Sequence, residues 1–428
     1  MKTVLKELIL NKKILILGFG REGRSTLREI MSLGGFSSIS VADKNNVSDI
    51  VPNDIPVIFG DTYLDIIDEY DVVFKSPGIV LKRSADEYKA LIVGEMDVFV
   101  KAYGDRIIGV TGTKGKSTTS SLIAHILKEN GKNVLFAGNI GIPVFDIADK
   151  VTKDSVIVIE MSCHQLEYIR YSPHVAVLLN IYEDHLDHYG TREKYALAKK
   201  HIYLNQGKDD LLFTTKETLS ECENILSKTI LIDKSMAPFT DLKEAGSVLK
   251  GEHNILNAAF AYEVSKMYGI GENGFLKAFS TFKGLPHRLE YIGNKDGVDY
   301  YDDSISTTVK SAISAIESIE NAGIILLGGM ERNLDYDELI DYLITSKLNG
   351  IVFMYDSGKR MYDLYIKAIA GKAKAPKAVY EKDLKDAVSY AVLNAEKGTA
   401  VLLSPAAASY DHFKNFEERG DVYKKLVF

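Results

Sequence analysis

Cysteine, long apolar runs and blocks of like charge are all scarce in this sequence of 428 residues. Its two cysteines, Cys163 and Cys222, are too few for a framework of disulfides. No apolar run reaches the roughly 20 residues that a helix needs to cross a bilayer. The first apolar segment is not followed by a small-residue cleavage site. We therefore expect a cytoplasmic protein that does not enter or span a membrane.

Basic residues are not gathered into any long block, and acidic residues outnumber them. The chain has 52 lysines and arginines against 59 acidic residues, which gives a formal net charge of -7. A charge of this sign disfavours wholesale binding to nucleic acid or to an anionic membrane surface. With 46% hydrophobic and 26% charged residues, the composition is that of a folded globular enzyme.

Short runs of valine and isoleucine alternate with amphipathic helical segments through most of the chain. This alternation is typical of parallel sheets covered by helices, so the predicted fold class is α/β. Three such series follow one another, with seams near Tyr103 and Leu285. We expect three domains: a Rossmann-like domain at 1–103, a central domain with a parallel sheet at 104–285, and a second Rossmann-like domain at 286–428.

Residues 106–130 have the pattern of a buried strand, a glycine-rich turn and a helix. The turn, TGTKGKST at 111–118, has small residues that let backbone N–H groups surround a phosphate at a helix N-terminus. Gly112 and Gly115 give this access, and Lys116 can reach the outer phosphates. The sequence therefore predicts a phosphate loop that binds ATP.

Two further positions bear on this loop. Ser117 offers a hydroxyl ligand to Mg²⁺. Val110 stands where the usual phosphate loop has a glycine, so the match is to a variant of the motif. A glycine-rich turn with an incidental lysine is the competing interpretation, but the flanking strand and helix favour ATP binding.

Polar residues also follow the neighbouring strands of the central series. Glu160 ends the run SVIVIE, and His185 comes soon after the run VAVLLN, which ends at Asn180. Ligands collect at the carboxyl ends of parallel strands. A carboxylate and an imidazole there, together with ATP phosphates, would suit Mg²⁺ or Mn²⁺. Taken alone, His185 would be a surface histidine, and the pair Lys199 and Lys200 would be a solvated helix face.

Two other patterns need a decision. GFGREG at 18–23 follows a strand and precedes Asp43, which is a dinucleotide fingerprint and makes NAD one interpretation. The same loop can hold a uridine diphosphate at the helix N-terminus. Cys163 and His164 are adjacent at a strand exit, where we expect their side chains to point apart and to form no nucleophile–base pair.

In combination these motifs resemble the Mur ligase family. The matching segments occur in the family's order, and the segment SPAAASYDHFKNFEERG resembles members that add glutamate. These segments lie at 111–118, 138–141, 160–162, 180–187, 195–199, 251–254, 284–288 and 404–420.

The resemblance implies an ADP-forming ligase of peptidoglycan precursor synthesis, a process required for the cell wall, cell shape and cell division. Such an enzyme activates the carboxylate of UDP-N-acetylmuramoyl-L-alanine as an acyl phosphate and joins it to D-glutamate. Its partners are ATP and these two substrates, and it is expected to act as a monomer. The three domains would hold the UDP sugar, ATP and the amino acid in that order, and they would close around bound substrates.

The resemblance also assigns roles to individual residues. Two Mg²⁺ ions, or Mn²⁺, are implied, together with a carbamate formed from CO₂ on Lys199; Lys200 points elsewhere on the helix. The catalytic residues would be Lys116, Lys199, His185 and Glu160. The metal ligands would be Ser117, Glu160, His185 and Lys199.

The implied substrate contacts form three sets. Those for ATP are Gly112, Thr113, Lys114, Gly115, Lys116, Ser117, Thr118, Asn254, Asn257, Arg288 and Asp303. Those for the UDP substrate are Gly18, Phe19, Gly20, Arg21, Asp43, Lys44, Ser76, Pro77, Gly78, Asn139 and Gln165. Those for the amino acid are Arg332, Ser409, Tyr410 and Phe416.

The chain departs from the family pattern at two positions. A family lysine two residues after Asp303 is replaced by Ile305, and another that helps to bind glutamate is replaced by Arg332. Isoleucine offers no charge to a carboxylate, whereas arginine can bind one in a bidentate manner. An L-glutamate-adding ligase therefore stays open as an alternative to a D-glutamate-adding one.

Two further alternatives belong to other classes. A folylpolyglutamate-synthetase-like ligase would not be expected to carry the domain at 1–103. An inactive scaffold would be expected to have lost Lys116, Glu160 or His185, and all three are present.

Overall fold

The computed structural model describes residues 1–370 and 375–428, and it divides into two compact units. Unit 1 comprises Met1–Asp241 and His253–Ser280, and unit 2 comprises Leu242–Glu252 and Thr281–Phe428. Both are built from sheets with parallel strands and flanking helices, which confirms the predicted α/β class. Within the described ranges, no helix is both long and apolar enough to span a membrane.

The first sheet of unit 1 has five parallel strands in the order β3-β2-β1-β4-β5. The inner strands are continuous apolar runs because helices and loops cover both faces of the sheet. Its strands are β1 (Lys13–Leu17), β2 (Ser38–Asp43), β3 (Val57–Phe59), β4 (Val72–Lys75) and β5 (Leu91–Val93). The helices of this part are α1 (Lys2–Ile9), α2 (Arg21–Leu33) and α3 (Glu95–Tyr103).

The second sheet of unit 1 has six parallel strands in the order β11-β10-β9-β6-β8-β7. The strands are β6 (Ile107–Thr111), β7 (Asn133–Gly138), β8 (Ser155–Glu160), β9 (Val175–Leu178), β10 (Leu211–Thr214) and β11 (Lys228–Leu231). The longer helices are α4 (Lys116–Glu129), α7 (Arg192–Leu204), α9 (His253–Lys266) and α10 (Glu272–Thr281). The shorter helices are α5 (Cys163–Leu166), α6 (Leu186–Tyr189) and α8 (Lys216–Leu219).

One hydrophobic core joins the two sheets of unit 1. It contains Ile14 and Ile16 of β1, Phe99 of α3, and Ile157 and Ile159 of β8, all of which are fully buried. Helix α4 packs on β6, β7 and β8, and α7 packs on β6 and β9. The two sheets of unit 1 therefore share one packed core.

Unit 2 contains a six-stranded sheet in the order β12-β13-β17-β14-β15-β16. All its strand pairs are parallel except β12–β13, which is antiparallel and forms one edge. The strands are β12 (Glu290–Lys295), β13 (Val298–Asp302), β14 (Ala322–Leu327), β15 (Gly350–Met354), β16 (Lys377–Glu381) and β17 (Ala400–Leu403). The helices are α11 (Val309–Ser318), α12 (Asp337–Thr345), α13 (Tyr355–Ala368), α14 (Leu384–Asn394) and α15 (Phe416–Val427).

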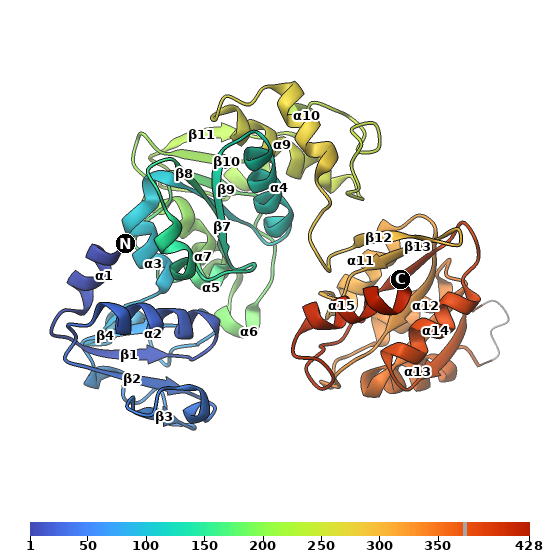
Figure 1. Cartoon of the computed structure of the whole chain (residues 1–428), viewed down its shortest axis with the longest axis horizontal. Helices are drawn as coiled ribbons and strands as arrows, with labels where there is room; N and C mark the ends of the chain where they lie inside the picture. Colours follow the sequence, from blue (N-terminus) through green and yellow to red (C-terminus); the bar gives the residue numbers. More distant parts are fainter. Residues whose placement is uncertain (371–374) are drawn as a thin grey trace. The chain divides into compact units, whose positions relative to one another are not determined.

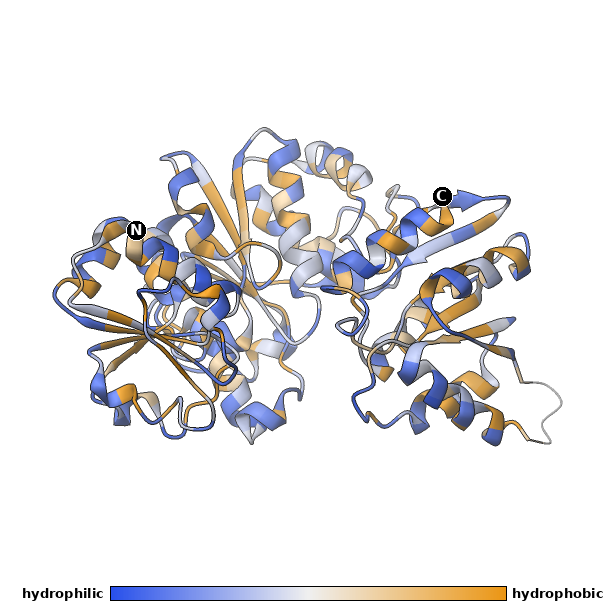
Figure 2. Ribbon diagram, turned by 60° about the horizontal axis from the view of Figure 1, so that its bottom comes forward, coloured by the Kyte–Doolittle hydropathy of each residue, from blue (hydrophilic) through white to orange (hydrophobic). Residues whose placement is uncertain are grey.

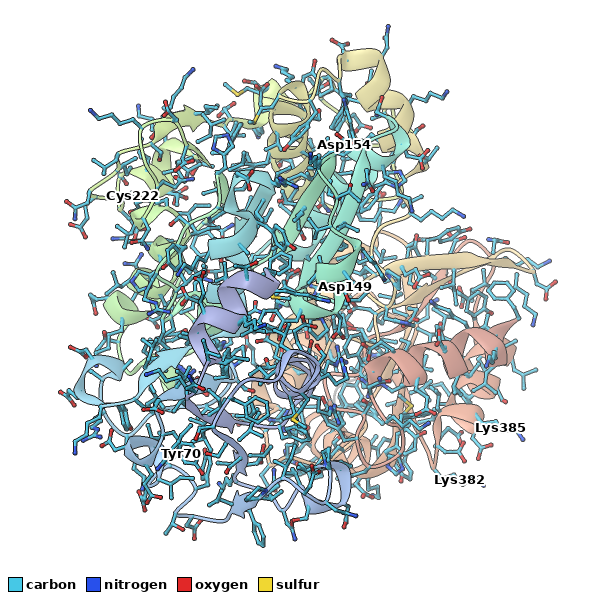
Figure 3. The ribbon with its side chains drawn as sticks, turned by 60° about the vertical axis from the view of Figure 1, so that its left-hand side comes forward. Tyr70, Asp149, Asp154, Cys222, Lys382 and Lys385 are labelled. Atoms are coloured by element: carbon cyan, nitrogen blue, oxygen red, sulfur yellow. The ribbon has the colours of Figure 1, made fainter. Side chains whose placement is uncertain are left out.

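Hydropathy follows the layers of these sheets. Figure 2 shows apolar residues concentrated on the strands and on the helix faces that cover them, with polar residues outside. Charged side chains of both signs lie on the surface, among them the exposed residues Asp149, Asp154, Lys382 and Lys385 that Figure 3 labels.

The boundaries at 103 and 285 that we predicted between three domains stay a prediction.

Candidate functional site

The predicted phosphate loop connects β6 to the N-terminus of α4, as the pattern of strand, turn and helix requires. Gly115 has a φ of +84°, a left-handed conformation that favours glycine. A Cβ atom there would lie 2.8 Å from Oδ1 of Asn257, which comes from α9. That same oxygen accepts a hydrogen bond of 3.2 Å from the hydroxyl of Thr119. Asn257 therefore fixes the first turn of α4 against the loop.

The other side of the loop is held by Asn180, which follows β9. Its Oδ1 accepts hydrogen bonds of 2.9 Å from the backbone N–H groups of both Thr113 and Lys114. Its Nδ2 donates to the carbonyl oxygen of Lys114 over 3.0 Å. One amide thus replaces the hydrogen bonds that a free glycine-rich loop would make to water.

Two lysines from different helices meet at the carbonyl oxygen of Gly112. Lys116 Nζ donates to it over 2.8 Å, and Lys199 Nζ, from α7, donates to it over 2.9 Å. Lys116 Nζ also donates to the carbonyl oxygen of Thr113 over 3.0 Å. The helix dipole at the start of α4 and these two ammonium groups make the loop a strongly electropositive place, as a phosphate site requires.

Lys199 is only 1% exposed, and its Nζ lies 4.6 Å from the ring centroid of Tyr195. Burial, together with the positive charge of Lys116, lowers the pKa of Lys199 to about 7. Its neighbour Lys200 faces elsewhere and lies 3.6 Å from a carboxylate oxygen of Glu223. Lys199 therefore has a neutral amine fraction, which reaction with CO₂ needs.

Glu160 ends β8 and is 1% exposed. Its Oε1 accepts a hydrogen bond of 2.6 Å from the side chain of Asn139. Its Oε2 is buried and has no hydrogen-bond partner within the described ranges. An unsatisfied carboxylate oxygen beside a phosphate loop is the donor that a hard divalent cation requires, so these residues fit Mg²⁺.

His185 lies just before α6 with a φ of +51°, and its side chain is 45% exposed. Its ring centroid lies 6.0 Å from that of Tyr195 and 4.9 Å from that of His164. The imidazole therefore lies close to the side of α7 that carries Lys199. Ser117, the remaining predicted metal ligand, is in the first turn of α4.

Our expectation that the side chains of Cys163 and His164 point apart is wrong. Both residues are in the short helix α5 rather than on an extended strand, and Cys163 Sγ lies 3.6 Å from His164 Nδ1. Burial, together with the neighbouring His188 and His185, lowers the pKa of His164 to about 4, so this ring is neutral at pH 7. Cys163 is 3% exposed, which leaves its thiol little access to a substrate.

The loop that carries the dinucleotide-like fingerprint packs against the loop after β4. Gly18 has a φ of +88°, and a Cβ there would lie 2.8 Å from the Cβ of Ser76, whose hydroxyl donates to the carbonyl oxygen of Gly18. Asp43, at the end of β2, accepts a hydrogen bond of 2.8 Å from the N–H of Phe19. Gly20 is the N-cap of α2, whose N-terminus therefore points toward this loop.

The other residues predicted to contact the UDP substrate lie on the same edge of unit 1. Arg21 and Lys44 are exposed, Pro77 and Gly78 continue the loop after Ser76, and Gln165 is in α5. The amide of Gln165 links the two sheets because its Nε2 donates to Glu22 Oε1 over 2.6 Å. This bond places Gln165 beside the first turn of α2, directly after Gly20 and Arg21.

Sequence reasoning missed a charged cluster at this joint. Lys75 is 5% exposed, and its Nζ lies 3.8 Å from Oε2 of Glu167, which also lies 3.2 Å from His188 Nε2. Burial lowers the pKa of Lys75 to about 8, against the opposing effect of Glu167 and Glu22. Burial also raises the pKa of Glu22. No local sequence signal marks the contacts among these residues, because they join segments far apart in the chain.

The remaining predicted ATP contacts lie in both units. Asn254, in α9 of unit 1, accepts a hydrogen bond from Asn257, and Thr118 is in the first turn of α4. In unit 2, Arg288 is exposed and Asp303 is 3% exposed. Burial raises the pKa of Asp303 to about 6, although it accepts hydrogen bonds from Ser404 Oγ and from the N–H of Leu289.

The residues predicted to bind the amino acid are all in unit 2. Ser409 is 3% exposed, Tyr410 is 68% exposed, and Phe416 starts α15. Met330 forms an antiparallel bridge with Ala408, which brings the segment before Arg332 alongside the segment before Ser409. Arg332 is exposed.

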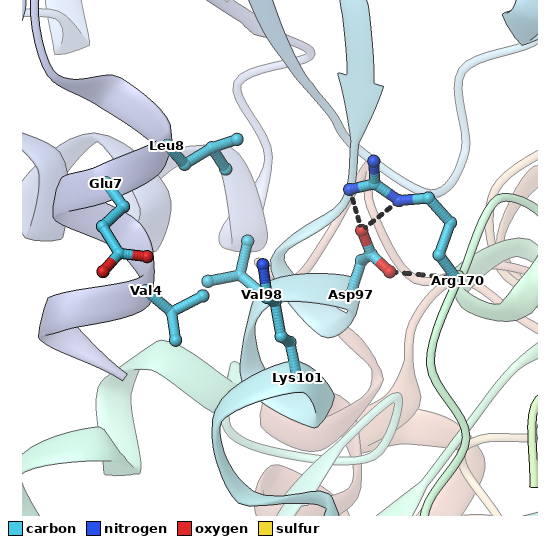
Figure 4. A pocket seen from close by; sticks show the side chains of 7 residues that line it. All are labelled: Val4, Glu7, Leu8, Asp97, Val98, Lys101 and Arg170. Atoms are coloured by element: carbon cyan, nitrogen blue, oxygen red, sulfur yellow. Dashed lines mark hydrogen bonds and ion pairs between the residues drawn. The ribbon is translucent and has the colours of Figure 1, made fainter.

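A separate pocket of about 200 Å³ lies in unit 1 and contains none of the predicted site residues. Figure 4 shows its lining, in which Asp97 binds Arg170. The other side chains come from α1 and α3: Val4, Glu7, Leu8, Val98 and Lys101.

Comparison with known proteins agrees with this geometry. The family model described as the Mur ligase middle domain matches residues 110–265, and the one described as the Mur ligase glutamate ligase domain matches residues 287–407. A protein of Geobacillus kaustophilus named UDP-N-acetylmuramoylalanine–D-glutamate ligase is 32% identical over 97% of this chain and 97% of its own. The chain belongs to the Mur ligase family. The resemblance stated from the motifs is confirmed, and with it an enzyme of the ligase class.

Other Mur ligases extend the comparison. A protein of the same name from Ligilactobacillus salivarius is 32% identical over 97% of this chain and 96% of its own. The crystal structure of the UDP-N-acetylmuramate–alanine ligase of Thermotoga maritima superposes with a TM-score of 0.57 at 19% identity, covering 97% of this chain and 98% of that one. The MurF ligase of the same organism, in complex with ADP, gives a TM-score of 0.56 at 16% identity over 99% and 96% of the two chains. These structures share the fold of this chain.

Proposed function

We propose that this chain is an ATP-dependent ligase that adds D-glutamate to UDP-N-acetylmuramoyl-L-alanine through an acyl phosphate. The observation that supports it most is the meeting of Lys116 and Lys199 at the phosphate loop, beside the unsatisfied carboxylate oxygen of Glu160. The shared name of the relatives points to the same substrates. The reaction would take place in the cytoplasm, as part of peptidoglycan precursor synthesis, on a monomeric enzyme.

The first requirement of this reaction is to bring two anions together, the γ-phosphate of ATP and the carboxylate of the muramoyl-alanine. The backbone N–H groups at the start of α4 and the ammonium group of Lys116 would hold the phosphates. Mg²⁺ ions bound by Ser117, Glu160, His185 and the modified Lys199 would neutralise phosphate charge. The carboxylate oxygen then attacks the γ-phosphorus, which forms the acyl phosphate and releases ADP.

Lys199 would serve as a metal ligand only after carbamylation, which replaces the positive charge of its side chain with a negative one. Its neutral amine attacks CO₂, a C–N bond forms, and a proton leaves, so that a cation becomes a carbamate anion. With a pKa of about 7, roughly half of the Lys199 amines are neutral at pH 7. The ring of Tyr195 and the carbonyl oxygen of Gly112 hold the side chain in place.

The amine of glutamate then attacks the acyl carbon, and the tetrahedral intermediate releases phosphate and leaves an amide. Ser409, Tyr410, Phe416 and Arg332 are the proposed contacts of the amino acid. The UDP moiety would lie on the edge formed by Gly18, Phe19, Gly20, Arg21, Asp43, Lys44, Ser76, Pro77, Gly78, Asn139 and Gln165. The assignment of Arg288 and Asp303 to ATP, and of the three domains to the three substrates, belongs to the same proposal.

The amino acid's configuration is the point on which a second candidate deserves a test. Ile305 removes a charge that the family pattern supplies, which favours an altered pocket and keeps L-glutamate as the alternative substrate. Arg332 can restore that charge. Chirality at the pocket therefore has to be measured directly.

The test is phosphate release by the full chain with ATP, Mg²⁺ and UDP-N-acetylmuramoyl-L-alanine. Parallel reactions contain D-glutamate, L-glutamate or no amino acid. We expect release that depends on D-glutamate. Dependence on L-glutamate would select the second candidate. It would make Ile305→Lys, which restores the lysine of the family pattern, the first substitution to test. No release with either enantiomer would exclude a glutamate ligase.

A further inference from the structure

Arg419, in α15, is the largest fully buried side chain of the described residues, with 0% exposure. Its guanidinium donates to four acceptor contacts: Ser304 Oγ at 3.0 Å, Ser304 O at 2.7 Å, Ala407 O at 3.0 Å and Ala408 O at 3.3 Å. All four acceptors are neutral. A buried guanidinium is costly to desolvate, and the four neutral acceptors offset this cost less than a directly bonded carboxylate would. The geometry of this network therefore needs a functional explanation.

The acceptors belong to two loops that leave neighbouring strands of the sheet. Ser304 follows β13, and Ala407 and Ala408 follow β17, with which β13 pairs. The loop after β14 also approaches, because a Cβ on Gly329 would lie 3.0 Å from Arg419 Nη1 and 2.3 Å from the carbonyl oxygen of Ala408. The planar fork of one arginine therefore sets the spacing of these loops, which a single-point lysine ammonium could not do.

Ser304 is the second member of the network and is 0% exposed. Its hydroxyl accepts from Arg419 Nε and donates to the carbonyl oxygen of Phe416 over 2.8 Å. Its N–H donates to Asp302 Oδ1 over 3.0 Å, and Asp302 in turn binds His287 Nδ1 at 2.7 Å. The side chain of Ser304 thus connects the end of β13 to the first residue of α15.

The chain positions that this network joins are those that the proposed function uses. Asp303, next to Ser304, is proposed to contact ATP, whereas Ser409, next to Ala408, and Phe416 are proposed to contact the amino acid. We infer that Ser304 and Arg419 are positioning residues that hold both walls of the amino-acid pocket in register with the nucleotide-binding aspartate. The inference rests on the proposed function, because it takes the pocket from it.

Asp303, the residue proposed to contact ATP, is held by a separate hydrogen bond at the ends of the same strands. Ser404 Oγ donates to Asp303 Oδ2 over 2.7 Å. Ser404 and Ser304 are both 0% exposed and differ in which neighbour their hydroxyls hold. They form a matched pair: removal of one hydroxyl affects the nucleotide side, and removal of the other affects the amino-acid side.

The experiment compares the full chain with its variants Ser304→Ala, Ser404→Ala and Ser318→Ala. Ser318 is a control, because its hydroxyl donates to the carbonyl oxygen of Ser314 within the same helix, α11. For Ser304→Ala we expect the KM for glutamate to rise about tenfold, with the KM for ATP within about twofold of wild type. For Ser404→Ala we expect the opposite split, and for Ser318→Ala no change.

A network with only a structural role would give a different result. It would lower the Tm of Ser304→Ala and either change the KM values for glutamate and ATP alike or change neither of them. Both outcomes would overturn the inference. Arg419→Lys serves as a second variant, in which we expect the rise in KM for glutamate to equal or exceed that of Ser304→Ala. If Arg419→Lys does not fold, the two serine variants still decide. Failure of the proposed function is distinct, because it would show as a wild-type chain without glutamate-dependent phosphate release.

Discussion

Lys116 and Lys199 donate to the same acceptor, the carbonyl oxygen of Gly112, over 2.8 Å and 2.9 Å. Two ammonium groups that share one buried acceptor repel each other, so one of them is favoured to lose its proton. Burial, reinforced by this repulsion, lowers the pKa of Lys199 in α7 to about 7. This relationship links the phosphate loop to the residue that we propose to be carbamylated.

The substitution Lys199→Ala should reduce phosphate release by roughly 10²- to 10³-fold, because it removes the proposed metal ligand. Acetate, which can occupy the vacated space with a carboxylate, should restore part of the rate. Lys200→Ala is the control, since Lys200 faces Glu223 and should retain full activity. Equal losses in both variants, or no effect of Lys199→Ala, would contradict the assignment. Steady-state phosphate release is the measurement.

Glu160→Gln should keep the hydrogen bond from Asn139 and the shape of the side chain but remove the charge that faces a cation. We expect the Mg²⁺ concentration for half-maximal activity to rise about tenfold or more, because a neutral amide is a poorer ligand for a hard cation. A Mg²⁺ titration of the phosphate-release rate measures this. Glu223→Gln, at an exposed position, serves as the control. An unchanged Mg²⁺ requirement in Glu160→Gln would remove Glu160 from the metal site.

The space at Gly115 makes a prediction about the phosphate loop. Gly115→Ala and Gly131→Ala both place alanine at a positive φ, which costs about 1 kcal/mol of stability in each variant. Only at Gly115 does the new Cβ meet Asn257 Oδ1 at 2.8 Å, since nothing lies within 4 Å at Gly131. We expect Gly115→Ala to lose about 1 kcal/mol more, and to lose ADP affinity, which Gly131→Ala keeps. Urea unfolding and calorimetric ADP titration test both parts.

The buried Lys75 predicts a pH dependence of stability. Its folded pKa of about 8 lies below the ordinary value of 10.5, so between these pH values the unfolded chain binds more protons and stability rises with pH. Between pH 7 and pH 9.5 the wild type should therefore gain about 2 kcal/mol more than Lys75→Met. Urea unfolding at the two pH values measures the difference.

The control for this measurement is Lys82→Met, whose lysine is exposed and pairs with Asp65 on the surface. Between the same pH values it should gain as much stability as the wild type. A Lys75→Met variant that also gains as much as the wild type would show that Lys75 is not a buried cation in solution.

Much of the central site could be predicted from the sequence because its signals are local. The phosphate loop is one uninterrupted segment between β6 and α4, and Glu160 is marked by its place at the end of an apolar strand. The runs of valine and isoleucine in the sequence do not predict β5, β11, β12 and β16. Of these, β5, β11 and β16 lie at sheet edges or are short, and β12 pairs antiparallel at an edge, where a continuous apolar run is not required.

The contacts that the sequence could not reveal are long-range ones. Gln165 binds Glu22 across the joint between the two sheets of unit 1, and Arg419 binds Ser304 across unit 2. Each of these depends on tertiary packing rather than on spacing along the chain. The error at Cys163 and His164 has a local cause, because α5 begins directly after the strand exit and brings the two side chains together.

The most direct test of the central claim follows an oxygen atom. UDP-N-acetylmuramoyl-L-alanine labelled with ¹⁸O in its alanine carboxylate is turned over with ATP, Mg²⁺ and glutamate, and the released phosphate is analysed by mass spectrometry. Attack of the carboxylate on the γ-phosphorus transfers one carboxylate oxygen to the phosphate, so the account predicts phosphate that carries one ¹⁸O for each amide formed. Amide formation with unlabelled phosphate would contradict it.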